Sequence, residues 1–488
     1  MADKKDVYVI GIPEYWQTLM PPLQHSISGF GVMVNQFEPL VRRGQKGLLE
    51  PLAAKSWEFS PDRRQLRFYI DTARRFSDGS NLCAADFKRS WEDGLRMQAK
   101  SNNSSLADAL TNLKGFAELK TKGEITGLRV VGTEVLELEF DKPIRSVLEH
   151  LSGVRYSAYK TAGERVIGTG PYAIIEADKI LTLTPNAYYA GAEPKLKNVR
   201  ILPVPPADAG RQLGAGKIDA LLFAESAAKS LNCDSEKNDP VQCAFGQEGT
   251  HTLIIVNGMP GRFFANAEHR LALQALVAKR FDCPATAWPV KGKGFMYDPQ
   301  SFLRFQAGRL PEKEARDIVS SGEKFIPQLK RYSQEHPLKL SYRLAWLVEY
   351  LEENGVKVDG NMKDSLDSKE WLAMVYKTFE PDIMPITGSV YDGDPDCLYH
   401  MLGRHGAIFS PMLERKGVAD GLEEGRKLTD PDRLAPHYQE VARDILKEVP
   451  YVHLGFYYWV VAYNSRRLKI NESFGGRNNQ SITIFEPN

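Results

Sequence analysis

Few residues of this chain are spaced as a catalytic or metal site requires. His400 and His405 are five positions apart, whereas two metal ligands on one helical turn are about four apart, so a surface or core role is favoured. Gly214-Ala215-Gly216-Lys217 lacks the earlier glycine and the following Ser or Thr of a phosphate-binding loop. Neither H-E-x-x-H nor G-x-S-x-G occurs. The residues therefore predict no enzyme, no cofactor and no metal.

Two cysteines bracket a polar loop. Cys233 and Cys243 enclose DSEKNDPVQ, and a disulfide that closes this loop is predicted for an oxidising compartment. Two free thiols are the alternative. A zinc site is disfavoured because the loop holds no histidine and neither cysteine belongs to a C-x-x-C pair.

Length and charge limit the classes of protein. With 488 residues the chain exceeds the ~250–300 residues of a single core, so at least two lobes are expected. Its 63 Lys and Arg against 62 Asp and Glu leave a net charge of +1, which shows no global bias toward nucleic acid or anionic membranes. The apolar run from Tyr451 to Tyr463 is shorter than the ~18–20 residues of a membrane span and predicts a buried strand.

The elements that must position any site alternate between strands and helices. Strands are predicted at 7–10, 66–70, 135–140 and 253–256, and helices at 85–97, 268–279, 344–354, 368–377 and 433–447. Asp432 is the predicted N-cap of the last helix. The chain is therefore mixed α/β throughout.

The most informative stretch is Gly168 to Glu225. Two β-rich runs, 172–177 and 180–185, flank a tight turn at Asp178-Lys179, and a third run covers 199–204. A helix begins at Asp208 and stops near Gly214, and a strand follows at 218–223. The order is strand, strand, strand, helix, strand.

This stretch resembles the peptide- and nickel-type extracytoplasmic solute-binding proteins of bacterial ABC importers (SBP family 5), which include the oligopeptide- and dipeptide-binding proteins. The resemblance rests on Gly168-Thr169-Gly170-Pro171-Tyr172, Asn186-Ala187-Tyr188-Tyr189-Ala190-Gly191, Pro194-Lys195-Leu196 and Leu213-Gly214-Ala215-Gly216-Lys217-Ile218-Asp219. The blocks Phe37-Glu38-Pro39-Leu40-Val41 and Gly393-Asp394-Pro395-Asp396 extend it toward both ends of the chain.

The resemblance implies a periplasmic-binding-protein-like α/β fold, with two main lobes around a ligand cleft and a smaller extra domain. Lobe one would comprise 1–41, 168–256 and 464–488, the small second lobe 42–167, and the third lobe, facing the cleft, 257–463. A solute, with a peptide as the first expectation, would bind between the lobes. The hinge would close on it and present a closed form to a membrane permease. A monomer without nucleic-acid partners is expected.

Site residues follow from the same resemblance. Tyr15 and Trp16 follow the first strand, where relatives place residues into the cleft, although both could instead cover the core of lobe one. Asn103 and Ser104 fall in a loop that reaches the cleft in peptide binders, or are ordinary loop residues.

Tyr391 and Asp392 mark a departure from the family. Peptide binders carry an Asp a few residues before the D-P pair, and it binds the peptide's α-ammonium group. Alignment on Asp394-Pro395 puts Tyr391 at that position, and Asp392 takes the role only if the loop shifts by one residue. A blocked peptide, an oligosaccharide, a metal chelate or another solute is therefore the alternative ligand.

Location follows from the family as well. Met-Ala-Asp-Lys-Lys-Asp leads directly into the first strand without a secretory apolar region, which suggests a mature periplasmic domain whose leader or lipid-anchor segment was removed. The alternatives are a cytoplasmic relative, or a sensor or chaperone-like relative without a permease.

Overall fold

The structure is a computed structural model of the chain. It describes all residues except 1–6, 25, 45–48, 102–106, 143–144, 178, 228–230, 232–239, 282–294, 303–305, 342–344, 361–379, 390–394, 400–416, 429 and 472–480. Two compact units are present. Unit 1 comprises Met1–Gln247, Gly292–Gly294 and Tyr458–Asn488, and unit 2 comprises Glu248–Lys291 and Phe295–Tyr457. The three-lobe division stays a prediction.

The sheet of unit 1 combines parallel and antiparallel pairs. Its strands are, in spatial order, β10 (Tyr172–Ala177), β11 (Ile180–Pro185), β12 (Asn198–Pro203), β1 (Val7–Ile12), β13 (Ala220–Leu221) and the end of β17 (Tyr451–Asn464). β1 pairs in parallel with β12 and β13, and the other neighbours are antiparallel. The predicted hairpin 172–177/180–185 is confirmed.

Both faces of this sheet pack against apolar core clusters. Successive residues of a strand point to opposite sides, so one strand contributes to both clusters. Ile10 and Ile12 belong to one core cluster, whereas Val9 packs against another that includes Ala209 and Leu213 of α6 (Pro206–Gly214). The predicted strand 218–223 is shortened to β13, and Phe223, two residues after its end, adopts a φ of 56°.

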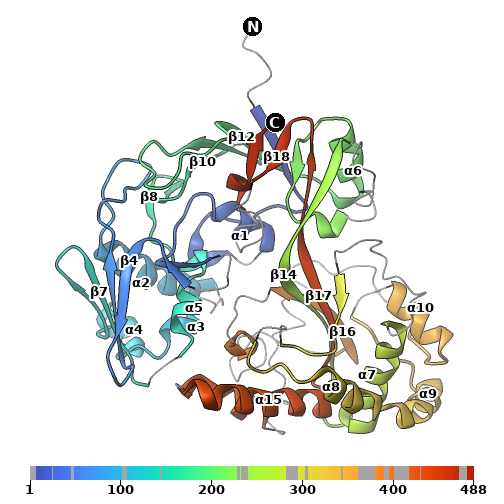
Figure 1. The fold of residues 1–488 in the computed structure, drawn as a ribbon. Helices are drawn as coiled ribbons and strands as arrows, with labels where there is room; N and C mark the ends of the chain where they lie inside the picture. The colour runs from blue at the N-terminus through green and yellow to red at the C-terminus, as the bar shows by residue number, and fades with distance from the viewer. Residues whose placement is uncertain are drawn as a thin grey trace. The chain divides into compact units, whose positions relative to one another are not determined.

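A second, antiparallel sheet in unit 1 has its own core. It has the order β4 (Ala54–Phe59), β5 (Gln65–Ile70), β7 (Val135–Glu139) and β6 (Leu128–Val131). Helix α2 (Ala84–Ser101) contacts β6 and β7 (Figure 1). All buried members of this core cluster come from residues 40–167, so this part of the chain packs around itself.

Unit 2 places helices on both faces of its strands. β17 neighbours β14 (Val241–Val256), and β14 pairs with β16 (Ile383–Ser389). The short strand β15 (Phe295–Tyr297) pairs with β17. Leu253 and Ile255 face α8 (Glu312–Ser320), α14 (Val418–Lys427) and α15 (Pro431–Glu448). Ile254 and Val256 face α7 (Ala267–Phe281), α9 (Ile326–Glu335) and α10 (Ala345–Glu353).

Two long strands carry the chain from one unit to the other. β14 passes the boundary between Gln247 and Glu248, and β17 passes that between Tyr457 and Tyr458. Figure 1 shows both as the longest arrows of the fold. The buried strand predicted at 451–463 is confirmed, whereas the strand predicted at 253–256 extends much further toward its N-terminus.

The predicted helices match α2, α7, α10 and α15, and the helix predicted at 368–377 lies outside the described residues. The predicted cap of α15 was wrong by two residues: Asp430 is the N-cap, and its Oδ1 accepts a hydrogen bond from Asp432 N at 3.0 Å. Among the residues that the structure describes, none of the helices combines the length and apolar character of a membrane span.

The remaining elements are short. In unit 1 they are η1 (Pro21–Leu23), α1 (Ile27–Met33), β2 (Val41–Arg43), β3 (Leu49–Pro51), α3 (Ala107–Leu110), η2 (Phe116–Glu118), α4 (Leu119–Lys122), α5 (Val147–Leu151), η3 (Val154–Tyr156), β8 (Lys160–Ala162), β9 (Arg165–Ile167), η4 (Ala224–Ala227), β18 (Leu468–Ile470), η9 (Ile482–Ile484) and β19 (Phe485–Pro487). In unit 2 they are η5 (Phe263–Ala265), η6 (Glu323–Phe325) and η7 (Pro395–Leu398).

Candidate functional site

The first loop, residues 13–24, follows β1 in unit 1 and carries the first two predicted site residues. Their rings contact each other, with centroids 4.3 Å apart. Their exposure differs completely: Tyr15 is 37% exposed and Trp16 is 0% exposed. Of the two neighbours, only Tyr15 offers a side chain to solvent.

Trp16 is part of the core of unit 1. It belongs to the same cluster as Ile10, Ile12 and Val199. Its indole Nε1 is buried and has no hydrogen-bond partner among the described atoms. This burial favours the core role that was the alternative for Trp16, and a ligand contact by this side chain stays a prediction.

Tyr15 is held at the surface by an acidic partner. Its hydroxyl donates to Oε1 of Glu176 on β10. The phenol must lose this hydrogen bond, and then sit beside a carboxylate, when it ionises. The hydrogen bond with Glu176 therefore raises the pKa of Tyr15 to about 12. Tyr15 stays a protonated hydrogen-bonding aromatic group near neutral pH.

Gln24 shapes the first loop from inside. It is fully buried. Its Nε2 donates to the carbonyls of Trp16 and, at 2.6 Å, Thr18, and its Oε1 accepts from Ser26 N at 2.8 Å. A Cβ on Gly29 would lie only 2.0 Å from Gln24 Nε2, so the glycine leaves room for this side chain. No sequence motif pointed to Gln24.

A second glutamine fixes the end of the same loop. Gln98, near the end of α2, is buried, and its Nε2 donates to the carbonyl of Pro22 at 2.5 Å. Ser26 caps α1 by accepting from Gly29 N at 3.0 Å. The loop that presents Tyr15 is therefore held by buried side-chain-to-backbone hydrogen bonds.

The other four predicted site residues, Asn103, Ser104, Tyr391 and Asp392, lie outside the described residues. Their roles stay predictions.

The chain on both sides of 390–394 is anchored in unit 2. Before it, Ser389 of β16 pairs with Thr250 of β14. After it, Asp396 of η7 is fully buried and forms an ion pair with Arg426 of α14, Nε to Oδ2, at 3.2 Å. The Arg426 guanidinium also lies 3.9 Å from the ring centre of Tyr399. Sequence reasoning gave no signal for Arg426.

The glycines of the signature stretch serve backbone contact. A Cβ on Gly168 would lie 2.1 Å from the carbonyl oxygen of Gln36, and Gly170 N donates to that oxygen at 2.8 Å. Asp219, at the end of the signature, accepts from Val9 N at 2.8 Å and pairs with Arg467 Nε at 2.8 Å. These motif residues build the scaffold of unit 1.

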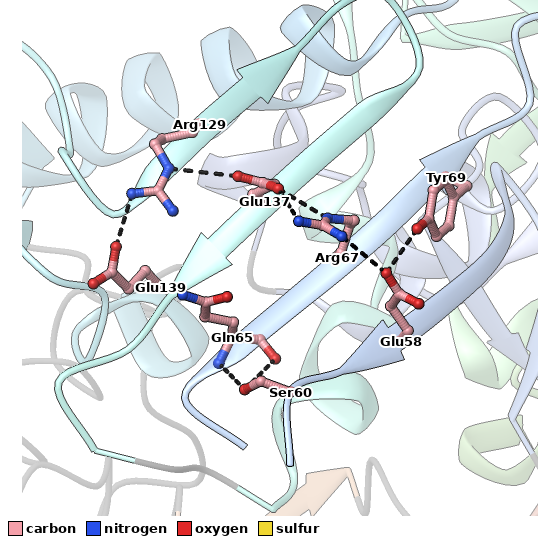
Figure 2. Close-up of polar contacts among 8 residues, drawn as sticks. All are labelled: Glu58, Ser60, Gln65, Arg67, Tyr69, Arg129, Glu137 and Glu139. Atoms are coloured by element: carbon pink, nitrogen blue, oxygen red, sulfur yellow. Dashed lines mark hydrogen bonds and ion pairs between the residues drawn. The ribbon is translucent and has the colours of Figure 1, made fainter. Parts of the chain in front are cut away.

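The most extensive ion-pair network on the four-stranded sheet is an exposed ladder. Figure 2 shows Arg67 between Glu58 and Glu137, at 3.1 and 2.6 Å, and Arg129 between Glu137 and Glu139, at 3.5 and 2.8 Å. Directly opposed residues of neighbouring strands carry opposite charges. The charges compensate one another, which is typical of a solvated sheet face rather than a ligand site.

A surface groove in unit 2 gives little support for a ligand site. It has a volume of about 640 Å³ and lies between α8 and α15. Two of its charged pairs, Lys313 with Asp317 and Arg443 with Glu314, are closed at 2.6 Å each. Across the described residues, no three His, Cys, Asp or Glu side chains come together as a metal site would require.

Comparison with known proteins shows what this chain is similar to. Residues 49–279 match the family model described as bacterial extracellular solute-binding proteins, family 5 middle. The chain is 24% identical over 360 residues to the periplasmic murein peptide-binding protein MppA of Escherichia coli, which covers 70% of this chain. The match spans 66% of MppA, just under two thirds of its length.

Solved structures match over nearly the whole chain. The murein tripeptide binding protein MppA of Escherichia coli superposes with a TM-score of 0.79 at 18% identity, over 99% of both chains. AgaA of A. tumefaciens R10, in complex with agropinic acid, gives a TM-score of 0.78 at 18% identity, also over 99% of both chains. These structures confirm the expected fold class, and the family 5 model matches residues 49–279 of the chain.

Proposed function

We propose that this chain is the solute-binding receptor of an ABC import system. It captures a solute by closing its lobes and delivers that solute to a membrane permease, as the sequence resemblance implied. The match of residues 49–279 to the family 5 model carries the proposal. The proposal includes a periplasmic location, a permease partner, a monomeric state and no enzymatic activity.

A peptide is the first proposed ligand. MppA, a relative on both sequence and fold, is a murein peptide-binding protein. AgaA has nearly the same fold similarity and binds agropinic acid. Because one fold serves both solutes, the ligand depends on individual side chains, and Tyr391 and Asp392 are the residues proposed to decide it.

Mass spectrometry of solute released from the purified full-length chain tests the proposal directly. A reproducible bound peptide supports peptide uptake, and an opine, sugar or metal chelate supports the alternative ligand while keeping the receptor function. Turnover of the released solute by the pure protein would contradict the receptor function.

Calorimetry with matched peptides tests the role of Asp392. If its carboxylate pairs with the peptide amine, Asp392→Ala weakens binding of a free-amine peptide by ~2–5 kcal/mol and leaves the N-acetylated form unchanged. The control is Asp208→Ala, which removes a surface carboxylate on α6. Equal affinity of wild type and Asp392→Ala for the free-amine peptide would eliminate this role.

A further inference from the structure

Two buried histidines form a direct hydrogen bond in unit 2. His251 lies on β14 and His453 lies on the neighbouring strand β17. Nδ1 of His251 and Nε2 of His453 are 2.7 Å apart, and the two residues are 1% and 2% exposed. Neither histidine belongs to a sequence motif of the family resemblance.

The partners of the two rings define where their protons are. Nδ1 of His453 lies 2.5 Å from the carbonyl oxygen of Asp298, which can only accept, so this nitrogen carries a proton. In the neutral ring Nε2 of His453 is then the acceptor, and His251 Nδ1 donates to it. His251 Nε2 remains as a buried acceptor without a hydrogen-bond partner among the described atoms.

A third proton has no suitable place in this arrangement. Protonation of His453 at Nε2 would bring its new N–H against the N–H of His251 and break the hydrogen bond between the rings. Protonation of His251 at Nε2 would create a buried cation whose new N–H has no described acceptor. Burial accordingly lowers the pKa of both rings, that of His453 to about 3.

The described groups around the pair do not stabilise a positive charge. The Asp298 carboxylate is already paired with Arg309 at 2.5 Å, and Arg309 disfavours a second cation. The hydroxyls of Tyr451 and Ser301 are hydrogen-bonded to each other at 2.5 Å. Gly388 of β16 lies opposite His251 in the strand register. The Phe456 ring contacts both imidazoles, with centroids 4.8 and 4.9 Å away.

The two histidines lie on the two strands that connect unit 2 with unit 1. β14 and β17 are the strands that pass from unit 2 into unit 1, and both histidines lie close to the boundaries at Gln247/Glu248 and Tyr457/Tyr458. A bond between the two imidazoles therefore ties these strands together just before they leave unit 2.

We propose that the His251–His453 pair is an acid-sensitive latch on the two connecting strands: it holds β14 to β17 while both rings are neutral, and its opening takes up protons as the pH falls below about 6.5. The sign follows from linkage. An opened or unfolded segment frees rings with ordinary pKa values, so it binds more protons than the closed form. Stability of the junction is therefore fully present above the ordinary histidine pKa and is lost progressively below it.

Hydrogen–deuterium exchange of the ligand-free, full-length chain between about pH 5 and 8 tests this, after correction for intrinsic exchange. Below pH 6.5 the opening constant of β14 and β17 should rise about tenfold per pH unit for each histidine that takes up a proton, so up to about a hundredfold for both. The hairpin β10–β11 of unit 1 is the internal reference.

Two variants sharpen the test. His251→Asn keeps an amide N–H toward His453 and removes one titrating group, so the slope should fall to about tenfold per unit. His437→Gln is the control, because His437 lies on α15 and bonds to the carbonyl of Gly421 at 2.7 Å, outside the pair. It should keep the slope of the wild type.

A slope near zero in the wild type, or an unchanged steep slope in His251→Asn, would overturn the proposal. If His251→Asn does not fold, ¹⁵N-histidine spectra of the wild type decide. Two rings with protonated Nδ1 and bare Nε2 that do not titrate individually support the latch, and ordinary titration of every histidine near pH 6.5 overturns it.

Discussion

The signature stretch and the first loop belong to the same unit, but their polar groups are used differently. In the signature stretch Asp219 and the backbone around Gly170 are bound to other parts of the chain. The first loop is held by Gln24, which bonds to backbone groups of the loop, and by Gln98 of α2, which bonds to Pro22. Tyr15 is exposed, and the Trp16 indole N–H has no described partner.

This contrast distinguishes the residues that carry the family resemblance from the residues proposed to contact the ligand. In this chain, motif residues such as Gly168 and Asp219 hold strands and loops of the scaffold together. Residues that face a solute are free to differ between relatives, as MppA and AgaA indicate with their different ligands on one fold. Under the proposed function, the residues that carry the resemblance are therefore expected to differ from those that choose the solute.

The largest effect on stability is expected for substitution of Trp16. It tests whether this residue of the first loop belongs to the core or to the ligand site. Trp16→Ala should lower the free energy of unfolding by ~3–5 kcal/mol, because it leaves a cavity in the core of unit 1. Trp16→Phe should lose much less, since it fills most of the space and removes an unpaired donor. Urea unfolding measures both. Equal, small losses together with lost solute binding would make Trp16 a ligand residue instead.

Asp219 tests the scaffold role of the signature. Asp219→Asn weakens two hydrogen bonds to a buried carboxylate and should lower the free energy of unfolding by ~2 kcal/mol. Solute affinity should remain that of the wild type at temperatures where the variant is folded. Asp208→Asn, at an exposed carboxylate of α6, is the control. A loss of affinity without a loss of stability would contradict the scaffold role.

Tyr15 should show the opposite pattern. Tyr15→Phe removes one exposed hydrogen bond, so stability should fall by no more than ~0.5 kcal/mol at neutral pH. That contribution is present below the ordinary tyrosine pKa and is lost as the pH rises toward about 12. Absorbance titration should lose one high-pKa phenol. Unchanged solute affinity by calorimetry would remove Tyr15 from the site.

The exposed ladder should give the smallest effect. Arg67→Gln breaks the pairs with the exposed Glu58 and the partly exposed Glu137 on the four-stranded sheet (Figure 2). The thermal midpoint at physiological salt should match that of the wild type, because screened surface pairs contribute little. Weaker solute binding in this variant would mean that the ladder is more than a solvated surface.

Much of the local structure could be predicted from the sequence, because it depends on neighbouring residues. The turn between 177 and 180 and the period-two runs around it predicted β10 and β11 at their observed bounds. The extent of β14 could not be predicted, because its N-terminal half lacks a clear apolar pattern. The candidate site was harder to predict from the sequence, because Gln24 and Gln98 donate to backbone carbonyls that no sequence motif marks.

The sequence by itself determined the resemblance to the family, the mixed α/β class and the local elements of the signature stretch, since these follow from residue types at short spacing. Only the tertiary structure decided that Trp16 is buried while Tyr15 is exposed, and that His251 meets His453 across 202 positions of the chain. Burial and long-range pairing depend on which strands become neighbours, and that is set by packing of the whole unit.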